Sequence, residues 1–237
     1  MISPWEKDWS TTQDLSMVSV GPSRWHVLGT DYLGRDLLAR LLCGGKISLS
    51  IGLFATAIAT FIALVVGLLC GYVGGKLDYW IMRMVDVFQT LPTTLLTMLL
   101  MVYFGTAMWT LCVALGITAW FTFARVIRAQ TQSLRSCQFV QSSLGIGQSH
   151  WRVLLLHILP SLWTTIRHYA ILLLPKVILD EAFLSFIGLG ISPPHSSWGN
   201  MIVDGVHVMQ SHPLQLFFPS LFFVITLLAI TSLAESF

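Results

Sequence analysis

The sequence predicts an all-helical membrane protein, and three observations point to that class: composition, long uncharged stretches, and unevenly placed positive charge. Of the 237 residues, 55% are hydrophobic and only 10% are charged, and the mean hydropathy is +0.75. Soluble domains carry about 25% charged residues. A chain with so few charges cannot cover a water-facing surface, so we expect lipid around most of it. The net charge of +2 is too small to indicate a nucleic-acid partner.

Three uncharged stretches predict four spans, because a helix needs about 20 apolar residues to cross a bilayer. The first is 47–73. A longer uncharged stretch is broken at FGTA (104–107), which predicts two helices, 86–103 and 108–125, joined by a tight outside turn. The last apolar run is 214–233.

The stretch 162–187 is a fifth expected span, although it is not purely apolar. It contains a proline and four charged residues: Arg167, Pro175, Lys176, Asp180 and Glu181. Charges inside a membrane are costly and face protein or water, so we expect this span to avoid lipid. Lys176 and Asp180 share one helix face. The alternatives are a translocation pathway lined by Lys176, Asp180 and Glu181, and an internal ion pair that only neutralises two buried charges.

The positive charges predict the orientation, since loops rich in Lys and Arg stay in the cytoplasm. Such residues gather in 74–83 and 126–162, and none follows Asp180. We therefore expect five spans, with the N-terminus and 188–212 outside. The expected domains are an external N-terminal segment, 1–46, and a transmembrane domain, 47–233, with its cytoplasmic loop at 126–162. The polar start, MISPWEKDWSTTQD, has no signal-peptide core.

Two glycine fragments resemble nucleotide sites without completing the motif. Gly74-Gly75-Lys76 would need glycine at position 70 and Ser or Thr at 77, where the chain has Cys70 and Leu77. The GIG run at 145–147 has no third glycine, because position 150 is His. The four cysteines are also far apart, so we expect no metal site, no cofactor and no ATP site in this chain.

The cytoplasmic loop carries the most informative pattern, FVQSSLGIGQSHWRVLLLHILP at 139–160. A short helix, a glycine, a second helix and a proline stop predict a compact knob that docks on a cytoplasmic partner. An ordinary loop is the alternative. The spacing resembles the EAA motif of ABC importer permeases, EAA-x3-G-x9-H-x-L-P in the peptide/nickel branch. The matching positions are Gln141, Ser142, Ser143, Gly147, His157 and Pro160. The motif's glutamate and alanines are here glutamine and serines.

Three further segments resemble the same family, in the family's order. They are LGTDYLGRD (28–36), MRMVDVFQTLP (82–92) and FLSFIGLGISPPHSSWGNMI (183–202). The resemblance spans 26–233. It implies the type I ABC importer permease fold, in which six spans are usual, the first before LGTDxLGRD. We expect five of these spans in this sequence, and no charged tail after the last.

The resemblance also implies function and partners. The chain is expected to be a non-enzymatic pore subunit in the bacterial cytoplasmic membrane. A second permease subunit, two ATPase subunits and an extracytoplasmic solute-binding protein would complete the importer. The solute is nickel, a nickel chelate or small peptides. HPLQLFFP (212–219), TLPTTLL (90–96) and the altered EAA segment favour nickel narrowly.

The outer loop and the membrane charges are the remaining candidate sites. Prolines and a glycine stiffen SPPHSSWG, and a rigid loop there would close the outer mouth or contact a delivery protein. A re-entrant turn is the alternative. The residues concerned are Pro193, Pro194, Trp198 and Gly199, and Trp198 is the type of residue expected at the membrane interface. In LGTDYLGRD, an ion network of Asp31, Arg35 and Asp36 is expected. We also expect Glu181 to matter for transport and Asp180 for stability.

Two other classes of function compete with the importer. An intramembrane enzyme would need a catalytic pair, but the chain has neither HExxH nor GxSxG. A stand-alone ion-coupled carrier would rely on Lys176, Asp180 and Glu181. Neighbouring genes for ATPases and a binding protein would favour the importer.

Overall fold

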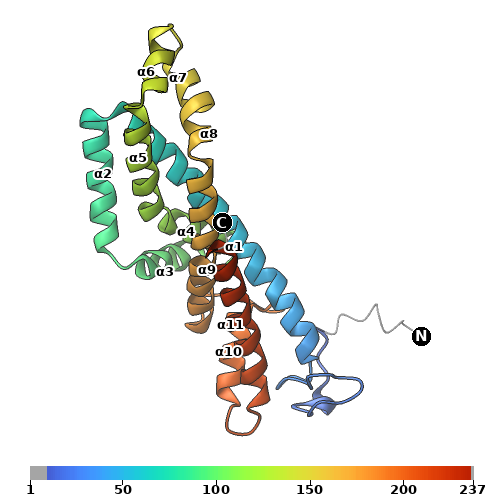
Figure 1. Cartoon of the computed structure of the whole chain (residues 1–237). Coiled ribbons are helices and arrows are strands. Elements are labelled where there is room, and N and C mark those ends of the chain that lie inside the picture. The colour runs from blue at the N-terminus through green and yellow to red at the C-terminus, as the bar shows by residue number, and fades with distance from the viewer. Residues whose placement is uncertain (1–9, 236–237) are drawn as a thin grey trace.

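The computed structural model describes residues 10–235, which are helical apart from loops and one isolated bridge between Thr30 and Asp36. The long helices run side by side as an elongated bundle (Figure 1). In chain order the elements are η1 (Leu15–Met17), α1 (Leu37–Val73), α2 (Gly75–Thr90), α3 (Thr93–Phe104), α4 (Met108–Ala119), α5 (Phe121–Arg135), α6 (Gln138–Gly145), α7 (His150–Val153), η2 (Leu154–Ile158), α8 (Leu159–Ser161), α9 (Trp163–Phe186), α10 (Trp198–His207) and α11 (Leu214–Glu235).

Helix α1 is the longest element and packs against α2, α4, α5, α9 and α10. Its 37 residues extend for about 55 Å, well beyond the hydrocarbon thickness of a bilayer. The Asp36 side chain caps its start by accepting from the Ala39 backbone N–H at 2.7 Å. Gly74, at φ +67, ends it. The helix therefore begins at Leu37, inside the segment expected to be external and before the expected span at 47.

The two middle spans differ from the expected pair of straight helices. Each is a bent pair: α2 and α3 meet at 87°, and α4 and α5 meet at 45°. The first bend falls at Pro92, which lacks a backbone N–H and disfavours helix in the residue before it. The turn between α3 and α4 lies where FGTA predicted it, with Gly105 at φ +89. Helix α5 continues past position 125, so the loop expected to begin at 126 is helical at first.

Within residues 10–235, two helical stretches are long and apolar enough to cross a membrane by themselves, α1 and Leu214–Ala234. Counting each bent pair as one span raises the number to four. Helix α9 forms where the fifth span was expected, with Pro175 inside it. Its four charged residues make it too polar to be recognised as a membrane span from length and composition alone.

The two ends of the molecule are formed by different parts of the chain. Figure 1 places α6 and α7 at one end, and α10 with the turn into α11 at the opposite end, near the N-terminal segment. This separation agrees with the orientation predicted from positive charge, in which 126–162 is cytoplasmic and 188–212 is outside.

Small residues allow α1 and α5 to approach closely, as in many membrane helix pairs. A Cβ added to Gly67 would lie 2.7 Å from the Ile127 Cβ, and one on Gly71 would lie 2.6 Å from the Thr131 Cβ. The two glycines are one turn apart and face the same partner. Either substitution would force the two helices apart.

Candidate functional site

The predicted knob is present, as two short helices joined by a left-handed glycine. Helix α6 ends at Gly145, and Gly147 adopts φ +88, which glycine tolerates best. The Gly147 N–H donates to the Leu144 carbonyl at 2.9 Å and the Gln148 N–H donates to Ser143 at 3.2 Å. These bonds close the end of α6 and turn the chain into α7.

Pro160 does not stop the helix as expected. The π-helical turn η2 precedes it, and the Leu159 N–H donates to the Leu154 carbonyl, five residues back. The wider turn accommodates a residue that has no N–H to donate. The chain then continues through α8 into α9, so the knob leads into the next span without a loop.

The positions matched to the EAA motif face outward. Gln141 and Ser142 are exposed, as is Gly147, and Ser143 is half-buried. Ile146 is 84% exposed beside the glycine. The knob is held from beneath by the buried side chains of Val140, Val153, Leu154 and Ile158, which belong to a larger hydrophobic core shared with α1, α5 and α9.

His157 has a structural contact within the knob. Its Nε2 lies 3.0 Å from the Gln148 Oε1, which joins η2 to the residue that follows the glycine turn. The Gln141 side-chain amide donates to the Arg135 carbonyl at 3.0 Å, which ties α6 to the end of α5. These bonds fix the knob relative to the bundle.

At the opposite end, a buried ion network joins the N-terminal segment to α10. Arg35 Nε lies 2.7 Å from the Asp31 carboxylate, as expected from LGTDYLGRD. Arg40 bridges Asp31 at 2.5 Å and Asp204 at 3.1 Å. Burial, and then the neighbouring Asp204 carboxylate, raise the pKa of Tyr32. The Tyr32 hydroxyl donates to Asp204 at 3.4 Å.

Asp36 was expected in this network but has other partners. Besides capping α1, its carboxylate lies 2.8 Å from His26 Nδ1. The sequence did not predict that Arg40 and Asp204 belong to this network, because they lie 164 residues apart and no local pattern joins them.

The SPPHSSWG loop is exposed at its prolines and buried at its end. Pro193 and Pro194 are exposed. Trp198 is only 4% exposed, and its indole N–H donates to the Leu41 carbonyl at 2.9 Å. Trp198 is therefore a packing residue in the bundle and not the interfacial anchor that the sequence indicated. Gly199 is buried, and a Cβ there would lie 2.7 Å from the Ser185 Cβ.

Glu181 lies in the interior of the bundle. Its side chain has no exposed surface. The Ser48 hydroxyl donates to Oε2 at 3.0 Å and the Ser185 hydroxyl donates to Oε1 at 2.8 Å. In residues 10–235, no Lys, Arg or His lies within ion-pair distance of it. A solute cannot touch Glu181 in this conformation, which argues against the expectation that Glu181 matters for transport.

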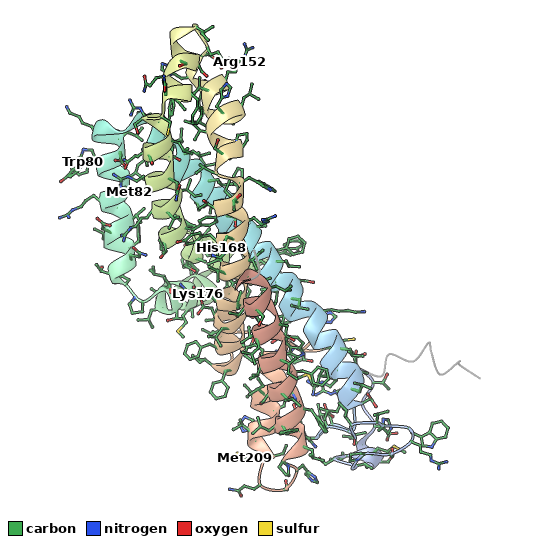
Figure 2. All side chains as sticks on the ribbon, in the orientation of Figure 1. Trp80, Met82, Arg152, His168, Lys176 and Met209 are labelled. Atoms are coloured by element: carbon green, nitrogen blue, oxygen red, sulfur yellow. The ribbon has the colours of Figure 1, made fainter. Side chains whose placement is uncertain are left out.

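Lys176 and Asp180 remain accessible midway along the molecule. Lys176 is exposed and Asp180 is half-buried, and Figure 2 shows Lys176 far from both ends. The alternative of an internal ion pair finds no support here: no salt bridge joins Lys176 and Asp180 among the described residues. Exposed charge at this depth faces water or protein, because hydrocarbon would not tolerate it.

Polar contacts between α2 and α5 form a second set of membrane charges, which the sequence reading missed. Arg128 binds Asp78 through two guanidinium nitrogens, and Arg125 pairs with Asp86. The acidic residues in 74–90 and the arginines in 121–135 were the sequence feature from which these ion pairs could have been predicted. Of the 16 residues of α2, only Asp78 and Val85 are buried, and the pairs to Arg128 and Arg125 join this helix to α5.

Comparisons with known proteins agree with this geometry. Residues 63–237 match the family described as binding-protein-dependent transport system inner membrane component. The oligopeptide transport system permease protein OppC of Haemophilus influenzae is 39% identical over 216 residues, covering 90% of this chain and 70% of that protein. The dipeptide permease DppC of Bacillus subtilis is 37% identical, covering 94% and 70%. The nickel permease NikC of Escherichia coli is 32% identical, covering 94% and 80%.

Solved structures show the same fold. A chain of the MetNI methionine ABC transporter in an inward-facing conformation aligns with a TM-score of 0.64 at 18% identity, covering 84% of this chain and 94% of that one. A chain from an amino acid ABC transporter with histidines aligns at 0.63 with 14% identity, covering 84% and 92%. Because the family model matches residues 63–237 and the relatives named above are 32–39% identical over most of its length, this chain belongs to the binding-protein-dependent inner membrane permeases of ABC importers.

Proposed function

We propose that this chain forms one half of the translocation pore of an ATP-driven importer for short peptides. The observation that carries the proposal is the knob of α6 and α7, which presents Gln141 and Ser142 on an exposed surface at the predicted cytoplasmic end. Such a projection has the form of a docking element for a cytoplasmic motor. A passive bundle without a partner would have no use for it.

Peptides are the favoured solute on the evidence of the relatives. The oligopeptide and dipeptide permeases named above share 37–39% identity with this chain, against 32% for the nickel permease. This reverses the narrow preference for nickel that segments 212–219 and 90–96 indicated. Nickel is the second candidate, because those segments and the NikC relative favour it.

The proposed assembly contains a second permease, two ATPase subunits and an extracytoplasmic solute-binding protein. The mismatched phosphate loop at Cys70 and Leu77 supports placing ATP hydrolysis in the separate ATPase subunits. Their closure would move the two knobs together and switch the pore between inward- and outward-facing states. The exposed Pro193 and Pro194, supported by the buried Trp198, would meet the delivery protein on the other side.

The proposed pathway runs along the exposed face of α9. Lys176 and Asp180 would line it, one attracting the carboxylate of a peptide and the other its amino group. Glu181 would not line the pathway. It would instead position the surrounding helices, because its side chain is enclosed by α1, α9 and α10. A stand-alone carrier would use the same charges but would transport without ATP.

The test is uptake by the complete importer in proteoliposomes. A labelled tripeptide and ⁶³Ni²⁺ are offered in parallel with the cognate binding protein, with and without ATP. We expect ATP-dependent peptide uptake, at least about tenfold lower in Lys176→Met and unchanged in Arg24→Gln, an exposed residue of the N-terminal segment. ATP-dependent uptake of Ni²⁺ alone would transfer the assignment to nickel, and uptake without ATP would favour the carrier.

A further inference from the structure

Behind the knob lies a cavity of about 500 Å³, between the end of α1, the end of α5, and α6 with α7. One side of it is apolar, formed by Leu69, Leu144 and Leu154. The other side is polar and aromatic, formed by Tyr72, Arg135 and His150. The exposed Ile146 of the knob does not line it, so the cavity and the tip of the knob are separate surfaces.

The polar side is organised around Tyr72. Its hydroxyl lies 2.7 Å from His150 Nδ1, and the two rings meet edge-on with centroids 5.8 Å apart. The Arg135 guanidinium sits over the Tyr72 ring, 5.8 Å from its centroid. Aromatic support of this kind holds a guanidinium in place while leaving its edge open to another ligand.

Arg135 carries a charge that the described part of the chain does not neutralise. No carboxylate in residues 10–235 lies within 4.0 Å of it. Its one hydrogen bond through the guanidinium is a long one, 3.4 Å from Nη1 to the Val73 carbonyl. Arg152 adds positive charge at the same end of the molecule (Figure 2). The site therefore favours an anion, and a guanidinium matches phosphate geometry.

The cavity lies at the end of α1 that is joined to α2, among exposed aromatic side chains. It adjoins Tyr72 and Val73, the last residues of the membrane-spanning α1. Tyr79 and Trp80 are exposed nearby in the chain, near the start of α2, and Trp151 lines the cavity itself and is 66% exposed. Exposed Trp and Tyr gather at membrane–water interfaces. Phosphate headgroups of the inner leaflet occupy that level.

We propose that this cavity binds the headgroup of an anionic phospholipid of the inner leaflet. The phosphate would bind Arg135, with Tyr72 and His150 beside it, and an acyl chain would lie along the leucines. The arrangement of one cationic and one apolar side suits an amphiphile better than a free ion. Gln141 also lines the cavity and donates to the Arg135 carbonyl. A bound lipid would therefore hold in place the first residue matched to the EAA motif.

The first experiment measures retained lipid on the assembled importer by native mass spectrometry. The complex is purified, delipidated and offered phosphatidylglycerol or phosphatidylcholine. We expect selective retention of phosphatidylglycerol, about tenfold weaker in Arg135→Gln, partly kept in Arg135→Lys and unchanged in Arg24→Gln. Equal retention in wild type and Arg135→Gln would overturn the proposal.

Two further arms separate other occupants. Inorganic phosphate at millimolar concentration should not displace the lipid; displacement would make the site one for free phosphate. In a variant whose four native cysteines are replaced by serine, Trp151→Cys should react with a maleimide lipid in vesicles containing the complete importer. An excess of phosphatidylglycerol should slow that reaction, and a labelling rate that phosphatidylglycerol leaves unchanged would overturn the lipid assignment. All these readouts are independent of which solute is transported.

Discussion

The carboxylate of Glu181 on α9 accepts a hydrogen bond from the Ser48 hydroxyl on α1 at 3.0 Å, across 133 residues of sequence. Ser48 in turn accepts from the Trp198 backbone N–H at 3.3 Å. This hydroxyl therefore relays a donor from the first turn of α10 to a carboxylate on α9. Three helices meet at one buried oxygen.

A second relay reaches the other oxygen of Glu181. The Asn200 N–H donates to Ser197 Oγ at 3.4 Å, Ser197 donates to Ser185 Oγ at 3.1 Å, and Ser185 donates to Oε1 at 2.8 Å. Ser197 is also the N-cap of α10. The positive end of a helix stabilises an anion near it, so the relays direct that end of α10 toward a carboxylate without a basic partner.

We predict that Glu181 determines stability and not solute recognition. Glu181→Ala should lower the free energy of unfolding by about 3 kcal/mol, because the Ser48 and Ser185 hydroxyls lose a buried acceptor. Glu181→Gln keeps one acceptor oxygen and should cost about 1 kcal/mol. Thermal unfolding of the purified complex in detergent measures both. Asp180→Asn is the control next in sequence, and a larger loss there than in Glu181→Ala would contradict the assignment.

Arg40 should be the most sensitive residue at the outer end. It is 3% exposed and pairs with two carboxylates, so Arg40→Met would leave Asp204 without its cation and weaken the hold on Asp31. Breaking a buried ion pair costs about 3–5 kcal/mol. The matched control, Arg24→Met, changes an exposed arginine of the same segment and should stay within about 0.5 kcal/mol. Urea unfolding followed by tryptophan fluorescence compares the two.

The glycine turn of the knob separates backbone strain from bulk. A Cβ on Gly147 would meet no atom within 4 Å, but the φ of +88 is unfavourable for most side chains. Gly147→Asn should therefore retain most transport, because asparagine tolerates this conformation. Gly147→Ala should strain the turn by about 1–2 kcal/mol. Gly147→Trp should abolish uptake while membrane insertion persists.

Gly145 provides the control for that series, because it also has open space but no positive φ. Gly145→Ala should leave uptake intact. Normal transport in Gly147→Trp would show that the knob does not dock against a partner at this position. Copurification of the ATPase subunits with each variant distinguishes lost docking from lost folding.

The purified chain should neither bind nor hydrolyse ATP. Position 70 is Cys and position 77 is Leu, so the fragment Gly74-Gly75-Lys76 lacks both the first glycine and the hydroxyl of a phosphate loop. Gly74 instead separates α1 from α2, which begins at Gly75. Nucleotide binding by the isolated chain, measured by calorimetry with the ATPase-containing complex as positive control, tests this. Specific ATP turnover free of ATPase contamination would contradict it.

Several features followed from local sequence. Long uncharged stretches predicted α1 and α11, because crossing a bilayer requires an unbroken apolar run. The spacing from Gln141 to Gly147 predicted the knob, since a helix followed by a glycine turn is a local structure. The bend at Pro92 was also local, but we read 86–103 as one helix, because apolar composition outweighed the proline.

The sequence by itself determined the membrane class, the order of the spans and the family resemblance, since each depends on residues close together in the chain. Only the tertiary structure decided which charges are enclosed. Glu181 is buried because Ser48 and the start of α10 pack against it, and Arg40 is buried because Asp204 lies beside it. Lys176 stays exposed on the same helix as Glu181. Burial depends on what packs from distant segments, and no pattern within one helix contains that information.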